Sequence, residues 1–124
     1  MDHVPRRAHA ARRVRLKGPA RLALVPPSAK YGDVLGGALG QVWGGWLQVT
    51  HLWVAETVRG QGHGRRLMKA AESYARSRGA IGATLETHSF QARPFYERLG
   101  YEVFGTLDGY PPGHAKCFLR KALV

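Results

Sequence analysis

The chain has 124 residues and a net charge of +11, from 19 Lys and Arg residues against 8 Asp and Glu residues. The length and a hydrophobic content of 44% are those of one soluble globular domain, and no apolar run approaches the roughly 20 residues of a membrane-spanning helix. A single cysteine, Cys117, excludes an intrachain disulfide, and no secretory pattern opens the chain, so we expect a cytoplasmic protein.

The positive charge is concentrated near the N-terminus. Residues 1–30 contain eight basic residues and a single acidic one, Asp2. We expect residues 1–20 to form a basic arm that is solvated and poorly ordered, as chain termini often are. Contact with nucleic acid, contact with an acidic partner and a transit peptide remain alternatives. The arm has no aromatic residue to stack on bases, so nucleic acid is a weak candidate partner.

The first predicted strand covers residues 21–25 and ends at the two prolines of "LVPPS". Residues 33–43 and 44–56 predict two further strands, joined as a hairpin at Gly44-Gly45. The second of them is rich in β-branched and aromatic side chains. The glycines in "DVLGGALG" weaken the first or mark a close approach to its backbone.

Beyond residue 60 the hydrophobic period becomes that of a helix. The residues that share one helical face are Leu67, Met68, Ala71 and Ala75. They predict a helix from about Gly64 to a stop at Gly79. Residues 80–88 alternate as a strand, and "RPFYERLG", residues 93–100, predicts a short helix with Pro94 in its first turn.

Two final strands are predicted over residues 101–106 and 115–123, divided by the turn-rich "LDGYPPGH". The resulting order is β-β-β-α-β-α-β-β, a mixed α/β sheet with hairpins at both ends. Because there is no linker or internal repeat, we expect residues 21–124 to form a single domain.

The glycine-rich stretch "RGQGHGRR" precedes the long helix directly. A helix N-terminus presents unpaired N–H groups and the positive end of its dipole, and glycines let a diphosphate approach the backbone. The stretch lacks the Gly-Lys-Ser/Thr ending of a P-loop and the third glycine of a Rossmann fingerprint. A phosphate cradle and a ligand-free glycine loop are the two interpretations left, and the length of the pattern favours the cradle.

Three stretches resemble, in their usual order, the GNAT superfamily of acetyl-CoA-dependent N-acetyltransferases. Residues 59–64, "RGQGHG", resemble its Arg/Gln-x-x-Gly-x-Gly/Ala signature. "LWVAETVRGQGHGRRLM" resembles the family's fourth strand, loop and third helix, and "SFQARPFYERLGYEVFG" resembles its fifth-strand exit, fourth helix and sixth strand. The resemblance covers roughly residues 34–122 and implies a mixed, mostly antiparallel sheet with flanking helices.

The resemblance implies that acetyl-CoA binds in a wedge where the fourth and fifth strands splay apart. The backbone of the fourth strand would pair with the pantetheine arm, amides of the glycine loop would hold the pyrophosphate, and Ser89 stands where many relatives have an Asn. The implied cofactor-binding residues are Leu52, Trp53, Val54, Arg59, Gly60, Gln61, Gly62, His63, Gly64, Arg65 and Ser89.

Acetyl transfer to an amine needs a base for the ammonium proton, a donor to the oxyanion and an acid for the leaving thiolate. By resemblance, Tyr96 is the acid, and a core aromatic is the structural alternative. The amide of Val54 is a candidate donor to the oxyanion.

The base is less well defined. Relatives often have a Glu on the fourth strand near the position of Gln48, which cannot act as a base. His51 titrates in the right range and is our catalytic candidate. In a regular strand His51 shares a face with Val49 and Trp53, so a buried structural histidine is equally open. Two further candidates are Glu56 and His88.

The family normally opens with a strand and two helices that wall off the substrate side. Only about 20 residues precede the first strand predicted here, so we expect this part to be truncated or atypical, and a homodimer to close the open side. The six histidines lack metal-ligand spacing, and no metal is expected.

The predicted function is an N-acetyltransferase that transfers the acetyl group of acetyl-CoA to a primary amine by direct attack in a ternary complex. The amine belongs to a small molecule or a peptide. The alternative is a non-catalytic acyl-CoA-binding or regulatory module on the same fold.

Overall fold

The computed structural model describes residues 11–14, 21–24, 36–88 and 92–124, and these form one seven-stranded sheet with two α-helices. The strands are β1 (Ala11–Val14), β2 (Arg21–Leu24), β3 (Gly36–Trp43), β4 (Trp46–Val54), β5 (Gly82–Thr87), β6 (Glu102–Asp108) and β7 (Ala115–Ala122). The helices are α1 (His63–Ser77), α2 (Arg93–Arg98) and a short 3-10 turn, Glu56–Val58. The strand order is β1-β2-β3-β4-β5-β7-β6, antiparallel throughout except for the parallel pair β4–β5. The expected mixed, mostly antiparallel sheet is confirmed.

Most predicted elements lie where the sequence patterns placed them, including the hairpin at Gly44-Gly45 and α1, which begins one residue before Gly64. Strand β1 was not predicted. Its four residues, "ARRV", lie inside the arm 1–20 and pair antiparallel with β2. Two arginines in so short a segment leave no alternation from which a strand could be recognised. The remainder of the arm lies outside the described residues.

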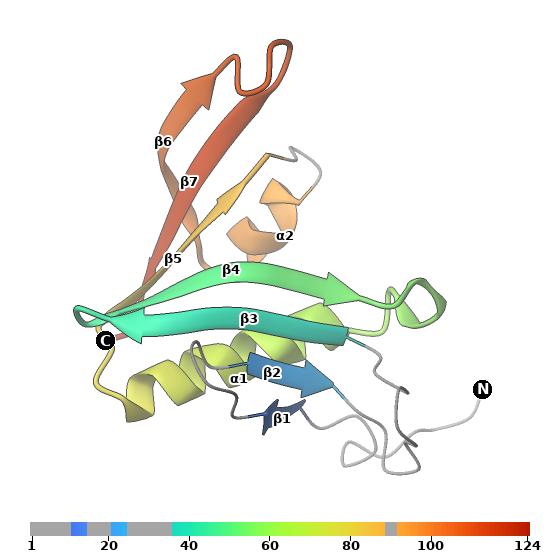
Figure 1. The fold of residues 1–124 in the computed structure, drawn as a ribbon, viewed down its shortest axis with the longest axis vertical. Coiled ribbons are helices and arrows are strands. Elements are labelled where there is room, and N and C mark those ends of the chain that lie inside the picture. The colour runs from blue at the N-terminus through green and yellow to red at the C-terminus, as the bar shows by residue number, and fades with distance from the viewer. Residues whose placement is uncertain (1–10, 15–20, 25–35, 89–91) are drawn as a thin grey trace.

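Helix α1 packs lengthwise against β3 and β4, as Figure 1 shows. Its buried apolar residues are those predicted to share a face: Leu67, Met68, Ala71 and Ala75. They form the core together with Leu47 and Val49 of β4, Leu85 of β5 and Leu119 of β7. Residues of α1 therefore share one hydrophobic core with strands on both sides of the β4–β5 pair.

A buried polar cluster ties α1 to the last strand. The carboxylate of Glu72, whose side chain is 1% exposed, accepts hydrogen bonds from the Tyr101 hydroxyl and from Lys121 Nζ, each at 2.8 Å. Burial, followed by the hydrogen bond with Glu72, raises the pKa of Tyr101, so its phenol remains a donor. The buried charge is thus paired on both oxygens.

No helix in the described part of the chain is long and apolar enough to cross a membrane.

Candidate active site

The parallel pair β4–β5 holds together only along its first half. Trp46–Val49 pair with Gly82–Leu85, and beyond them the two strands separate (Figure 1). A bulge in β4 accompanies the separation: Leu39 of β3 pairs with His51, and Gly40 pairs with Val49, which leaves Thr50 as an extra residue. A bulge bends its strand, so the last residues of β4 turn away from β5. The backbone edge of β4 that faces β5 is left without a strand partner there.

Because of the bulge, the side chain of His51 lies on a different face of β4 from the one expected. Side chains alternate along a regular strand, so His51 would share a face with Val49. The extra residue Thr50 reverses that alternation: Val49 is buried and His51 is exposed. His51 therefore lies on the face opposite to α1, and the buried structural histidine that the pattern left open is wrong.

The glycine-rich loop leads from the 3-10 turn into α1. Gly60 and Gly62 both have φ of 80°, a left-handed conformation that favours glycine, and Gly62 is the N-cap of the helix. The first intrahelical bond runs from Arg66 N to Gly62 O, so the amides of His63–Arg65 lie in the first turn of the helix, at the positive end of its dipole. These amides and the glycine backbone form a cradle suited to a phosphate.

Arginines hold the loop in this shape. Arg59 Nε donates to the carbonyl of Val54 at 3.3 Å, and Arg66 Nη1 donates to the carbonyl of Gln61 at 2.9 Å. Arg66 Nη1 also lies 3.0 Å from Nδ1 of His63, whose side chain is buried. A guanidinium can only donate, so Nδ1 of His63 accepts this bond and the ring proton is carried by Nε2. Arg66 was not among the predicted site residues, although its i+3 spacing from His63 was a usable signal.

A cleft of about 690 Å³ lies between the end of β4, this loop and α2. Gly64 permits its shape, because a Cβ there would stand 3.2 Å from Cζ of Phe95. Ten of the predicted site residues line it: Leu52, Trp53, Val54, Arg59, Gly60, Gly62, His63, Gly64, Arg65 and Tyr96. Gln61 contributes the carbonyl that Arg66 holds, and Ser89 lies outside the described residues.

Tyr96 lies where this cleft meets the gap between the strands. Its ring packs edge-on against Phe95 and Tyr101, at centroid distances of 5.1 and 6.0 Å. Burial raises the pKa of Tyr96 above the ordinary value of 10.0. A phenol with a raised pKa keeps its proton at neutral pH, as a general acid must before it reacts.

Two further hollows continue from Tyr96 through the gap. One, of about 340 Å³, shares Leu52, Ala92 and Tyr96 with the cleft. The other, of about 420 Å³, shares six residues with the first and reaches the sheet face opposite to α1. The shared residues are Val49, Thr50, His51, Leu85, Glu86 and His88. The three spaces share lining residues in succession along the gap between β4 and β5, and we refer to them together as the passage.

The lining of the passage distinguishes between the candidates for the general base. His51 and His88 line both hollows, whereas Glu56 opens the 3-10 turn and lines none of the three spaces. Glu86, which the sequence patterns did not indicate as a site residue, lines both hollows and pairs with Lys116 at 2.9 Å. The ring of His88 stacks on Tyr110 of the β6–β7 turn, at 5.5 Å.

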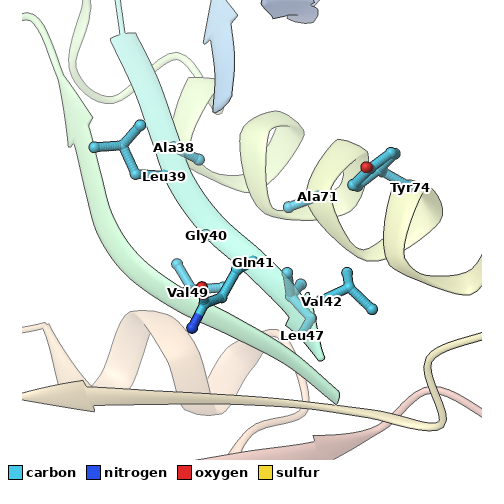
Figure 2. A pocket seen from close by; sticks show the side chains of 9 residues that line it. All are labelled: Ala38, Leu39, Gly40, Gln41, Val42, Leu47, Val49, Ala71 and Tyr74. Carbon is cyan, nitrogen blue, oxygen red and sulfur yellow. The ribbon is translucent and has the colours of Figure 1, made fainter. Parts of the chain in front are cut away.

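A separate apolar hollow lies between β3, β4 and α1, lined by residues that include Ala38, Val42, Leu47 and Tyr74 (Figure 2). Its volume is about 20 Å³, room for little more than one water molecule. It is too small for an organic ligand.

Comparisons with known proteins bear on this geometry. The sequence profile of the Acetyltransferase (GNAT) family matches residues 3–101. Blasticidin-S acetyltransferase of Streptomyces morookaense is 44% identical over 93 residues, which are 74% of this chain and 68% of that protein. This chain thus spans about two thirds of that relative's length.

Solved structures share the fold. An acetyltransferase from Bacillus cereus ATCC 14579 superposes with a TM-score of 0.74 at 28% identity, over 96% of this chain and 79% of that one. An aminoglycoside 6'-N-acetyltransferase complexed with coenzyme A has a TM-score of 0.74 over 86% of this chain and 73% of that one. Its identity is 18%, so this likeness concerns the fold.

Proposed function

Because the chain belongs to the acetyltransferase (GNAT) family, we propose that it transfers the acetyl group of acetyl-CoA to a primary amine, by direct attack in a ternary complex. The observation that carries the proposal is the passage through the split sheet. One end of the passage opens at the glycine loop and the other end at the polar hollow of about 420 Å³. Acetyl-CoA and the amine can therefore enter from opposite ends and be bound near Tyr96 at the same time.

The cleft on the helix side takes the cofactor. In the proposed complex the pyrophosphate lies on the amides of His63–Arg65, with the positive end of α1 behind them. The pantetheine arm pairs with the open backbone edge of Leu52–Val54 in the manner of an added strand. The family relationship and the coenzyme A complex of a structural neighbour support this placement.

The transfer forms an N–C bond and breaks the C–S bond of the thioester. The amine must first lose a proton, because an ordinary alkylammonium has a pKa of about 10.4. We propose His51 as the base, since it lines both hollows on the acceptor side, with His88 as the other candidate there. The amide of Val54 is the proposed donor to the oxyanion.

Tyr96 then protonates the departing thiolate. Its raised pKa, caused by burial, keeps the proton in place until the thiolate forms. Collapse to the amide releases the second nitrogen proton, which restores the phenol of Tyr96. The proton removed first from the ammonium leaves through the base, so the reaction yields CoA thiol, the acetylated amine and one proton.

Thiol release from acetyl-CoA, measured across a panel of amines, tests this function. Blasticidin-S is the first acceptor to include, because the relative at 44% identity acts on it by name. Release that depends on an added amine supports the proposal. Binding of acetyl-CoA without release for every amine would instead favour a non-catalytic acyl-CoA-binding module.

A further inference from the structure

We infer that the acceptor is a small amine that carries additional O–H or N–H donors, such as a polyhydroxylated amine, rather than an apolar monoamine. The inference rests on the proposed function and deepens it. It is drawn from the hydrogen-bonding character of the 420 Å³ hollow on the acceptor side.

Two threonines in the hollow are restricted to accepting. Thr50 Oγ1 donates its only hydrogen to the carbonyl of Leu39 at 3.1 Å, and Thr84 Oγ1 donates to the carbonyl of Leu119 at 3.0 Å. A hydroxyl with its hydrogen committed offers only lone pairs to a ligand. Both threonine hydroxyls can therefore bind a ligand only by accepting a hydrogen bond from it.

A carboxylate adds to this acceptor surface. Lys116 Nζ contacts Oε2 of Glu86 at 2.9 Å, and the side chain of Glu86 remains 44% exposed. A carboxylate has lone pairs for about four hydrogen bonds, so one lysine does not saturate it. His51 and His88, when neutral, each offer one acceptor and one donor.

The opposing donor capacity is small. Gln48 is the one side-chain amide among the described residues that line the hollow. Its Oε1 accepts from Gln41 Nε2 at 3.2 Å, which leaves its NH₂ group for a ligand. Acceptors thus outnumber donors along the described lining. A ligand complementary to it must bring several donors, because an acceptor that the ligand covers and leaves unpaired loses its hydrating water and costs binding energy.

The volume argues in the same direction. A hollow of about 420 Å³ lies within the range of small-molecule sites, roughly 300–1,000 Å³, and exceeds what one alkylamine fills. We therefore expect an acceptor large enough to contact both Thr84 and Glu86, which line this hollow.

The test uses two acceptors of matched ring size, a hexosamine and cyclohexylamine. We expect the hexosamine to have the higher kcat/KM. In Thr84→Val the ratio of hexosamine to cyclohexylamine kcat/KM should fall about fivefold, and in Glu86→Gln about tenfold or more, as expected for one neutral and one charged hydrogen bond. Thr106→Val, an exposed threonine on β6 outside the hollow, is the matched control and should leave the ratio unchanged.

Preference for cyclohexylamine, or equal effects of Thr84→Val on both acceptors, would overturn the inference. If no amine releases thiol, the proposed function fails, and calorimetry of hexosamine binding to the CoA complex still decides the inference. Tighter binding of the hexosamine than of cyclohexylamine supports it, and the reverse order overturns it.

Discussion

Replacement of Lys121 by methionine probes the buried polar cluster that joins α1 to β7. Methionine keeps most of the length of lysine and removes the charge that contacts Oε1 of Glu72 at 2.8 Å. The side chains of Glu72 and Lys121 are 1% and 14% exposed, so water cannot replace the lost partner readily. Tyr101 continues to donate to Oε2, which leaves Glu72 half satisfied.

The expected loss of stability follows from this burial. Removing one partner of a buried ion pair typically costs about 3–5 kcal/mol, because it leaves an uncompensated buried charge. The matched control is Arg93→Met, which breaks the i, i+4 pair with Glu97, where the two side chains are 45% and 43% exposed. Exposed pairs contribute about 0–1 kcal/mol.

Urea unfolding at neutral pH, followed by circular dichroism, measures both changes. We predict that Lys121→Met lowers the free energy of unfolding by at least about 3 kcal/mol and that Arg93→Met lowers it by less than about 1 kcal/mol. Equal losses in the two variants would show that the ion pair with Glu72 does not stabilise the fold as its burial indicates.

Four further outcomes are expected. Acetyl-CoA should raise the melting temperature of the wild type and not that of Gly62→Glu, which places a carboxylate at the proposed phosphate cradle; equal shifts would contradict the assignment. Tyr96→Phe should lower kcat roughly 10²- to 10⁴-fold with little change in acetyl-CoA affinity, and a loss of only a few-fold would remove the acid role. The protonated phenol of Tyr96 is the active form and burial raises its pKa, so ionisation of Tyr96 should lower the wild-type kcat only above pH 10. A decline of kcat below pH 9 that is present in the wild type and absent in Tyr96→Phe would contradict this. Light scattering at micromolar concentration should give a dimer mass, since Trp43 and Phe104 are 83% and 51% exposed, whereas a monomer mass throughout would exclude the homodimer.

Local patterns were sufficient for most of the fold. The helical spacing of Leu67, Met68, Ala71 and Ala75 predicted the buried face of α1, because that spacing reflects burial on one side of a helix. The glycine loop and the RLGY stretch were likewise readable, since both depend on short-range geometry. Through the resemblance to the GNAT superfamily, these stretches named ten of the residues that line the 690 Å³ cleft, but not Ala92 and Phe95.

The features that were missed depend on contacts distant in the sequence. The bulge at Thr50 is a property of the pairing between β3 and β4, so no pattern within β4 alone shows that His51 faces away from Val49. Glu72 of α1 and Lys121 of β7 are 49 residues apart and come into contact only in the folded chain. The ion pair of Glu86 with Lys116 arises in the same way, from the pairing of β5 with β7.

Initial-rate measurements of thiol release, with acetyl-CoA and an accepted amine both varied, test the central claim most directly. If both substrates meet at Tyr96 within one passage, double-reciprocal plots should intersect, because the rate then requires a complex that holds both. Parallel plots, the signature of an acetyl-enzyme intermediate, would contradict direct transfer. Release that is independent of the amine would contradict the acetyltransferase assignment of the passage itself.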